Sequence, residues 1–361
     1  MSPPLRIPPT QRSTLALLSR QPWWPANRKY PGIANGWQGA AWVAFKLASA
    51  GVAVPDRVFD AVARRLTAEL DEAPSTRIGA MIGCAAEAVI AAYAAQRGLV
   101  TRAVVRAACR RVHAMVRRSD AWDLHVGLSG TLLAFLEIAA VEPSALGAFQ
   151  PRPLVDRLRA QVDALCTLPP TGWHTGMAHG PAGAMMALEA CGAAGWCRIT
   201  TGRRQRWLDL LSRSALASEG GGLFWPATAG AQELGLQSWC AGTPGIALAL
   251  LQCFRLTHEA VYLEVAREAL EGMKLLFGKP FFSPTLCCGS AGYRHIFVEA
   301  YRVTGEDAWL VHARREARLA PSATSRPRLG LHQGELGIAY LADRLANPRA
   351  LPFPALGAFS L

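Results

Sequence analysis

The chain has 361 residues, of which 51% are hydrophobic and only 18% are charged. This composition supplies enough apolar side chains for a large buried core and excludes an intrinsically disordered chain. The formal net charge of +12 comes from basic residues spread along helical stretches such as 102–118, without a recognised nucleic-acid-binding motif. We therefore expect a solvated basic face and no nucleic-acid partner, with an acidic peptide as the alternative partner.

The sequence also bears on the cellular compartment. Residues 1–25 are polar and contain prolines, and they lack the hydrophobic region of a secretory signal. The longest uncharged apolar run, residues 240–254, is too short to cross a bilayer. Nine cysteines, an odd number, favour metal binding or catalysis over a disulfide framework. We expect a cytoplasmic protein without a membrane span.

A pair of glycines that precedes an apolar stretch recurs seven times, so the chain contains an internal repeat. The second glycines lie 44 to 62 residues apart. The pairs are Gly36 and Gly39, Gly79 and Gly83, Gly127 and Gly130, Gly180 and Gly183, Gly242 and Gly245, Gly289 and Gly292, and Gly334 and Gly337. A sharp entry into a helix favours glycine, because close backbone approach leaves no room for a Cβ atom. We call the segment at each pair a turn and number the turns 1 to 7 in chain order.

Two kinds of helical stretch alternate along the chain. Those after the turns are apolar almost all round, as in helices buried on every side, and include 40–50, 131–140, 184–190 and 246–254. Amphipathic stretches between them include 59–72, 154–168, 203–219 and 259–277. No alternating strand pattern extends beyond a residue or two. This predicts an all-α protein, an α/α toroid of seven helix pairs, as a single domain over 31–361. Residues 1–30 are expected to form an extension with the first outer helix.

Three of the turns carry residues with metal-binding or acid–base chemistry. Turn 5 contains Trp239 and Cys240, turn 6 contains Cys287 and Cys288, and turn 4 contains His179. If the repeat closes into a ring, these turns share one rim and the three cysteines face a common space. Three thiolates with a vacant fourth position are typical of a catalytic zinc site, and soft sulfur ligands select zinc over magnesium or calcium. The nearby helix N-termini stabilise thiolates further.

The pattern Trp-Cys-x-Gly-x-Pro-Gly at 239–245, with Cys-Cys-Gly beginning 47 residues after its cysteine, resembles the lanthionine synthetase C-like family of lanthipeptide cyclases. The seven turns resemble that family's toroid, so the similarity covers nearly the whole chain. The resemblance implies that Cys240 and Cys287 bind Zn²⁺. It makes Cys288 the third ligand, where stand-alone members usually have histidine and the cyclase halves of fused enzymes often have cysteine. The chain is too short to include a dehydratase, so a separate dehydratase is expected.

The resemblance also implies the acid–base residues. The family's His-Gly in turn 4 is matched by His179, and its acidic residue shortly before turn 3 is matched by Asp123. His125 and His174 lie nearby in the sequence and are alternatives to His179. These residues are expected to form the catalytic acid–base group.

This sequence departs from the family pattern at one position. The family commonly has an arginine four residues before the first zinc cysteine, and this chain has Leu236 there. Gln237 is the nearest polar residue, and we expect Gln237 and Trp239 to contact the substrate.

The implied reaction joins two residues of a dehydrated precursor peptide. A cysteine thiol adds to dehydroalanine or dehydrobutyrine, and His179 protonates the α-carbon, which gives a lanthionine or methyllanthionine ring. One alternative is a non-catalytic zinc-containing toroid that binds glutathione or a modification enzyme. Another is a glycoside-processing toroid, which needs two facing carboxylates. The rim offers Asp123, Glu233 and Glu335 for that chemistry, without an obvious pair.

Overall fold

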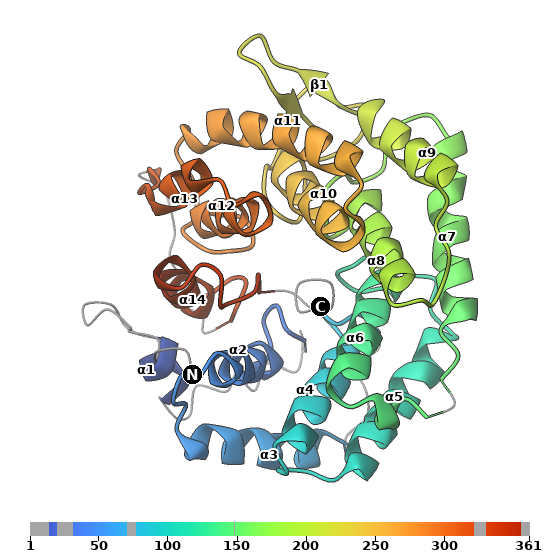
Figure 1. Cartoon of the computed structure of the whole chain (residues 1–361), viewed down its shortest axis with the longest axis vertical. Coiled ribbons are helices and arrows are strands. Elements are labelled where there is room, and N and C mark those ends of the chain that lie inside the picture. Colours follow the sequence, from blue (N-terminus) through green and yellow to red (C-terminus); the bar gives the residue numbers. More distant parts are fainter. Residues whose placement is uncertain (1–13, 20–31, 71–76, 148, 321–329, 355–361) are drawn as a thin grey trace.

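The computed structural model describes residues 14–19, 32–70, 77–147, 149–320 and 330–354. Within them, seven inner helices surround a common axis and seven further helices lie outside them (Figure 1). The inner helices are α2 (Trp37–Ser49), α4 (Ala85–Gln96), α6 (Leu128–Val141), α8 (Pro181–Ala193), α10 (Thr243–Thr257), α12 (Ser290–Thr304) and α14 (Glu335–Ala346). The outer helices are α1 (Thr14–Ser19), α3 (Asp56–Leu70), α5 (Arg102–Val116), α7 (Arg152–Thr167), α9 (Thr201–Ser212), α11 (Ala260–Phe277) and α13 (Asp307–Arg314). The prediction of an all-α, seven-pair α/α toroid is confirmed.

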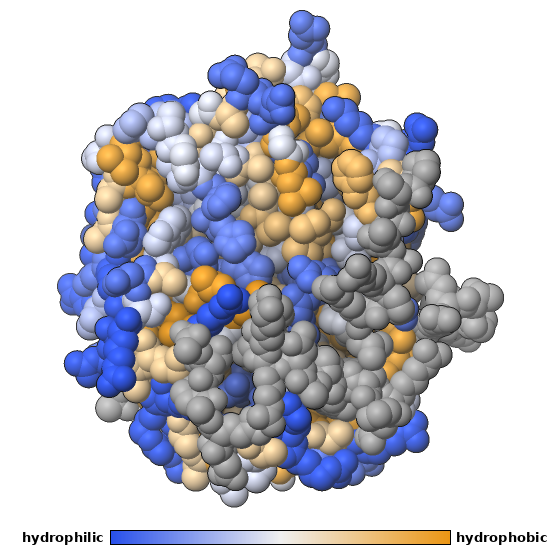
Figure 2. Space-filling model, turned by 180° about the vertical axis from the view of Figure 1, so that it is seen from behind, coloured by the Kyte–Doolittle hydropathy of each residue, from blue (hydrophilic) through white to orange (hydrophobic). Residues whose placement is uncertain are grey.

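The remaining elements are small. A 3₁₀ helix, η1 (Pro143–Ala145), follows α6, and the antiparallel strands β1 (Leu216–Ala217) and β2 (Leu223–Phe224) lie beside α11. No helix of the described segments combines the length and the apolar character needed to cross a membrane. Figure 2 shows a face on which hydrophilic and hydrophobic residues are interspersed, as is usual for a folded chain. The predicted boundary between residues 30 and 31 lies outside the described residues.

The two rings differ in burial as the sequence pattern predicts. In α8, every residue from 181 to 191 is buried. In α5, the buried positions 105, 108, 109, 112 and 116 follow the three- and four-residue spacing of one helical face, and the opposite face carries the basic residues. Consecutive inner helices pack together from α2 to α14. Trp42 of α2 then meets Tyr340 of α14 with ring centroids 6.1 Å apart, which closes the ring.

The second glycine of a turn permits the close approach of backbones. A Cβ atom added at Gly245 would lie 2.1 Å from the carbonyl oxygen of Trp239 and 2.6 Å from the nitrogen of Met177 in turn 4. Gly242 additionally has a φ of +75°, a conformation that side chains disfavour. The seven turns all precede inner helices. Backbone hydrogen bonds between neighbouring turns, together with the cysteines shared by turns 5 and 6, place them on one rim, as expected from the repeat.

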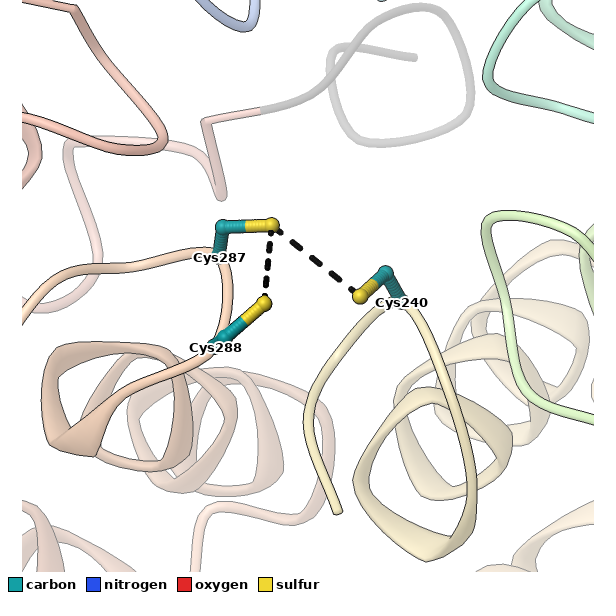
Figure 3. A group of neighbouring side chains, drawn as sticks. All are labelled: Cys240, Cys287 and Cys288. Atoms are coloured by element: carbon teal, nitrogen blue, oxygen red, sulfur yellow. Dashed lines mark hydrogen bonds between the residues drawn. The ribbon is translucent and has the colours of Figure 1, made fainter. Parts of the chain in front are cut away.

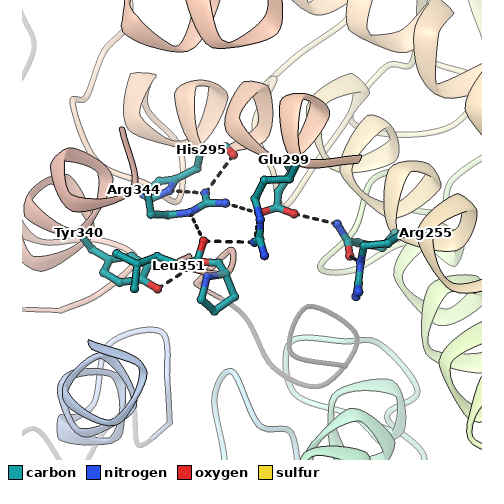
Figure 4. Close-up of polar contacts among 9 residues, drawn as sticks. Arg255, His295, Glu299, Tyr340, Arg344 and Leu351 are labelled. Carbon is teal, nitrogen blue, oxygen red and sulfur yellow. Dashed lines mark hydrogen bonds and ion pairs between the residues drawn. The ribbon is translucent and has the colours of Figure 1, made fainter. Parts of the chain in front are cut away.

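A layer of polar residues interrupts the apolar inner helices. Five helices carry a polar residue seven positions after the second glycine of their turn, namely Lys46, Glu137, Gln252, Glu299 and Arg344. All five are buried, and the charged ones are paired across helices, because an unpaired buried charge is strongly unfavourable. Glu299 accepts from Arg344, Arg302 and Gln252 (Figure 4). The sequence pattern predicted only the apolar character of these helices.

The segment that follows α14 returns to the interior of the ring. Leu351 accepts a hydrogen bond from Arg344 Nε at 3.2 Å, within the polar layer (Figure 4). Three residues later, the carbonyl of Pro354 lies 2.9 Å from Nε2 of His332 in turn 7. Phe353 between them is completely buried. This segment therefore connects the polar layer to the rim.

Candidate metal and acid–base centre

The three predicted cysteine ligands meet between turns 5 and 6 (Figure 3). The Sγ atoms of Cys240 and Cys287 are 4.0 Å apart, those of Cys287 and Cys288 are 3.4 Å apart, and all three lie within 4.8 Å of one another. Tetrahedral zinc with Zn–S bonds of about 2.3 Å places its sulfurs about 3.8 Å apart. All three are free cysteines, and Cys240 and Cys287 are buried. The donor set and its spacing therefore fit one zinc ion.

The cysteine cluster is arranged to concentrate negative charge on Cys240. The thiols of Cys287 and Cys288 lower the pKa of Cys240 by hydrogen bonding, and Ser238 Oγ, 3.0 Å from its sulfur, lowers it further. The same interaction raises the pKa of Cys287 and Cys288, because each is held as a donor to the Cys240 sulfur. Cys240 is thus the sulfur that most readily carries a charge in the protein alone.

Asp123 and His179 form the predicted pair at the neighbouring turns. Oδ1 of Asp123 accepts from the backbone N–H of Val126 at 2.7 Å, which orients the carboxylate. Oδ2 lies 3.0 Å from Nδ1 of His179. This hydrogen bond raises the pKa of His179, although burial opposes it. His179 remains 38% exposed in its side chain, so it is accessible from outside.

His125 is the partner of His179 and not simply an alternative to it. Nδ1 of His125 lies 3.2 Å from Nε2 of His179, and the rings stack with centroids 4.8 Å apart. Burial and the charge of His179 lower the pKa of His125 to about 4, so His125 is neutral near pH 7. Because Asp123 accepts from Nδ1 of His179, the Nε2 of neutral His179 is an acceptor for the Nδ1–H of His125.

The other predicted histidine lies in the same neighbourhood. The ring centroids of His174 and His179 are 5.9 Å apart, and His174 is exposed. Within the part of the chain that the structure describes, no hydrogen bond joins the rings of His174 and His179. A direct part for His174 in proton transfer stays a prediction.

The residues expected to contact substrate are built into turn 5. The Gln237 amide donates to backbone carbonyls at 2.8 and 3.0 Å and accepts from the nitrogen of Thr243 at 3.0 Å. Trp239 is completely buried, and its ring lies 4.9 Å from that of His332. Leu236, at the position of the family's arginine, is 50% exposed. Both Gln237 and Trp239 support the turn that carries Cys240, and their contact with substrate stays a prediction.

The fold and the site together define a class of protein: an α/α toroid with three thiols and a histidine–aspartate pair on one rim. The family model of the lanthionine synthetase C-like proteins matches residues 31–356, and the chain belongs to this family. Among solved structures, nisin cyclase resembles it with a TM-score of 0.64, covering 87% of this chain and 88% of that chain at 14% identity. At that identity the likeness concerns the fold, and it agrees with the toroid expected from the sequence.

Proposed function

We propose that the protein is a zinc-dependent lanthionine cyclase. It adds cysteine thiols of a dehydrated, ribosomally made peptide to dehydroalanine or dehydrobutyrine residues of the same peptide, which forms thioether rings. The observation that carries this proposal is the group of three cysteine thiols within 4.8 Å, on the rim of a toroid of the lanthionine synthetase C-like family. A separate dehydratase is expected to supply the substrate.

Cys240, Cys287 and Cys288 would hold the zinc ion. When bound, zinc supplies a Lewis acid with one coordination position left over, and it makes a substrate thiol acidic. The burial of Cys240 and Cys287 keeps water away from the donor sulfurs and strengthens electrostatic interactions there. Ser238 restrains the orientation of the Cys240 side chain by its contact of 3.0 Å.

His179 is the group that returns a proton to the substrate. Addition of sulfur to the β-carbon leaves negative charge at the α-carbon and the adjacent carbonyl, and a proton must then be added to the α-carbon. Asp123 keeps a proton on Nδ1 of His179 and raises its pKa, so the doubly protonated ring can donate from Nε2. His125 stacks on this ring and donates to Nε2 only while His179 is neutral, so the Nδ1–H of His125 must give up this contact before Nε2 can donate to substrate. The proton lost from the thiol balances the proton gained at carbon.

The two alternative functions, a glycosidase and a non-catalytic scaffold, agree less well with the geometry of the site. A glycosidase site needs two free carboxylates facing a sugar, but Asp123 engages Val126 with one oxygen and His179 with the other. A non-catalytic scaffold that binds glutathione or a modification enzyme would not require the raised pKa of His179. Whether the protein consumes the thiols of a dehydrated peptide therefore distinguishes a cyclase from a scaffold.

The test mixes zinc-loaded protein with a dehydrated peptide and follows the loss of free thiol by alkylation and mass spectrometry. We expect the native protein to consume thiols and Cys240→Ala to lose both zinc and activity. His179→Asn should keep zinc and react roughly 10²–10⁴-fold more slowly. Unchanged thiol content with fully loaded native protein would instead favour the scaffold.

A further inference from the structure

The turns are joined to their neighbours by backbone hydrogen bonds at six of the seven junctions around the rim. These bonds, of 2.7 to 3.2 Å, run from Ile33 N to Ala80 O, Ile82 N to His125 O, Leu124 N to Ala178 O, Ala178 N to Cys240 O, Cys287 N to His332 O, and His332 N to Ala34 O. Within the described residues, none joins turn 5 (residues 238–245) to turn 6 (residues 286–292). The rim therefore has one junction without a backbone connection.

The glycines show the same gap independently. At each of the six connected junctions, a Cβ atom added to a glycine would lie within 3.3 Å of the neighbouring turn. The closest examples are Gly32 to Met81, Gly79 to His125, Gly183 to Leu124, Gly245 to Met177, Gly337 to Leu286, and Gly39 to Leu331. At Gly292 of turn 6, the three atoms nearest to the added atom, out to 3.9 Å, all belong to Leu286 of its own turn. The second glycine of turn 6 thus lacks the contact with the preceding turn that Gly183, Gly245, Gly337 and Gly39 make.

The three cysteines occupy this gap. Cys240 belongs to turn 5, whereas Cys287 and Cys288 belong to turn 6, and the sulfurs of Cys240 and Cys287 face each other at 4.0 Å. Apart from the thiol contacts, Tyr293 Oη at the start of α12 donates to Gln237 O across this junction, and this hydrogen bond is long at 3.3 Å. Two metal–sulfur bonds of about 2.3 Å can bridge the 4.0 Å between the sulfurs of Cys240 and Cys287. A single N–H···O hydrogen bond spans only about 3 Å between its heavy atoms.

We propose that the bound metal ion is the seventh connection of the rim, and that it joins turns 5 and 6 where the other turns are joined by their backbones. This inference rests on the metal ligands of the proposed function and does not depend on the cyclisation reaction. The three cysteines contribute unequally to the connection. Cys240 is the single ligand from turn 5, so it alone carries the connection on that side, whereas turn 6 contributes two ligands.

This arrangement couples metal binding to a local opening of the ring. Without the ion, the junction between turns 5 and 6 is the place where the rim opens first, because it lacks the bonds that restrain the other six. Metal that binds only the closed junction lowers the open population in proportion to its concentration over Kd, about 100-fold at one hundred times Kd. The site therefore positions α10 and α12 relative to each other as well as binding a metal.

Hydrogen exchange measured by mass spectrometry tests the proposal without any peptide substrate. Zinc-loaded protein is compared with protein stripped by a chelator, and the turns 3 and 4, joined through Leu124 and Ala178, serve as the internal control. We expect peptides covering 238–242 and 286–289 to exchange at least about tenfold faster without zinc, and the control peptides to change little. Equal exchange at turns 5 and 6 in the two states would overturn the proposal.

Two cysteine variants then separate the connection from general stabilisation by metal. In Cys240→Ser, any zinc retained by turn 6 cannot bridge the junction, so turns 5 and 6 should exchange as in stripped protein. In Cys288→Ser, Cys240 and Cys287 still span the junction, so saturating zinc should restore most of the protection. Equal loss of protection in both zinc-loaded variants would contradict the bridging assignment.

If Cys288→Ser holds no zinc, the comparison of zinc-loaded and zinc-stripped native protein decides whether the metal connects the two turns. If zinc protects turns 5 and 6 from exchange but the native protein does not cyclise the peptide, the proposed function is overturned and the metal connection stands.

Discussion

Replacing Glu299 by glutamine tests whether the polar layer holds the inner ring together. The Glu299 side chain is 2% exposed and is paired with Arg344, which is completely buried, and with Arg302 at 2.9 Å. Glu299→Gln keeps the shape but leaves the Arg344 charge without a counter-ion. Breaking a buried pair in this way typically lowers the free energy of unfolding by about 3–5 kcal/mol. A chain of 361 residues has an unfolding entropy of about 0.8 kcal/mol/K, so Tm should fall by about 4–7 °C.

The assay is thermal and urea unfolding of native and variant proteins at equal zinc occupancy. The matched control is Glu271→Gln, which removes the same charge from a partly exposed pair with Lys274 on α11. Because both partners of that pair contact water, its loss should change the free energy of unfolding by about 0–1 kcal/mol. The double variant Glu299→Leu with Arg344→Met should recover much of the lost stability, because no fully buried charge is left unpaired and Arg302, which is 21% exposed, can be hydrated. A Glu299→Gln variant as stable as the control would refute the reasoning.

Three further predictions concern the site and the turns. Asp123→Asn replaces the carboxylate that raises the pKa of His179 by a neutral amide, so this pKa should fall. A proton donor acts below its pKa, so the alkaline limb of the cyclisation rate should move to lower pH; an unmoved limb would assign the acid elsewhere. Cys288→His should keep zinc and slow cyclisation without stopping it, because fewer thiolates make the bound substrate thiol more acidic and less nucleophilic; an equal or faster rate at every pH would show that thiolate number is unimportant. Gly245→Ala should lower Tm strongly, since its Cβ would lie 2.1 Å from a carbonyl oxygen, whereas Gly202→Ala, with open space around it, should be neutral or stabilising; similar Tm values would argue against close packing of the turns.

The fold could be predicted from the sequence because the toroid is a sum of local patterns. Each glycine pair specifies a close turn, and the apolar or amphipathic character of the next stretch specifies an inner or an outer helix. Cys240 and Cys287 were recognised as partners because they stand at equivalent places of consecutive repeats. Closing the ring brings such places together, whatever the details of packing. The histidine and aspartate of turns 4 and 3 followed from the family resemblance.

Other features depended on the assembled ring. The pairing of His125 with His179 is a contact of 3.2 Å between residues 54 positions apart, and helical periodicity says nothing of how two such rings are rotated. The same holds for Glu299 and Arg344, which look like isolated polar residues in apolar helices until α12 and α14 lie side by side. The gap between turns 5 and 6 is invisible in the sequence, where the glycine pairs of these two turns have the same spacing as most of the others. Local preference determines which elements form, but distances and rotations between distant segments are set only when their side chains pack against one another.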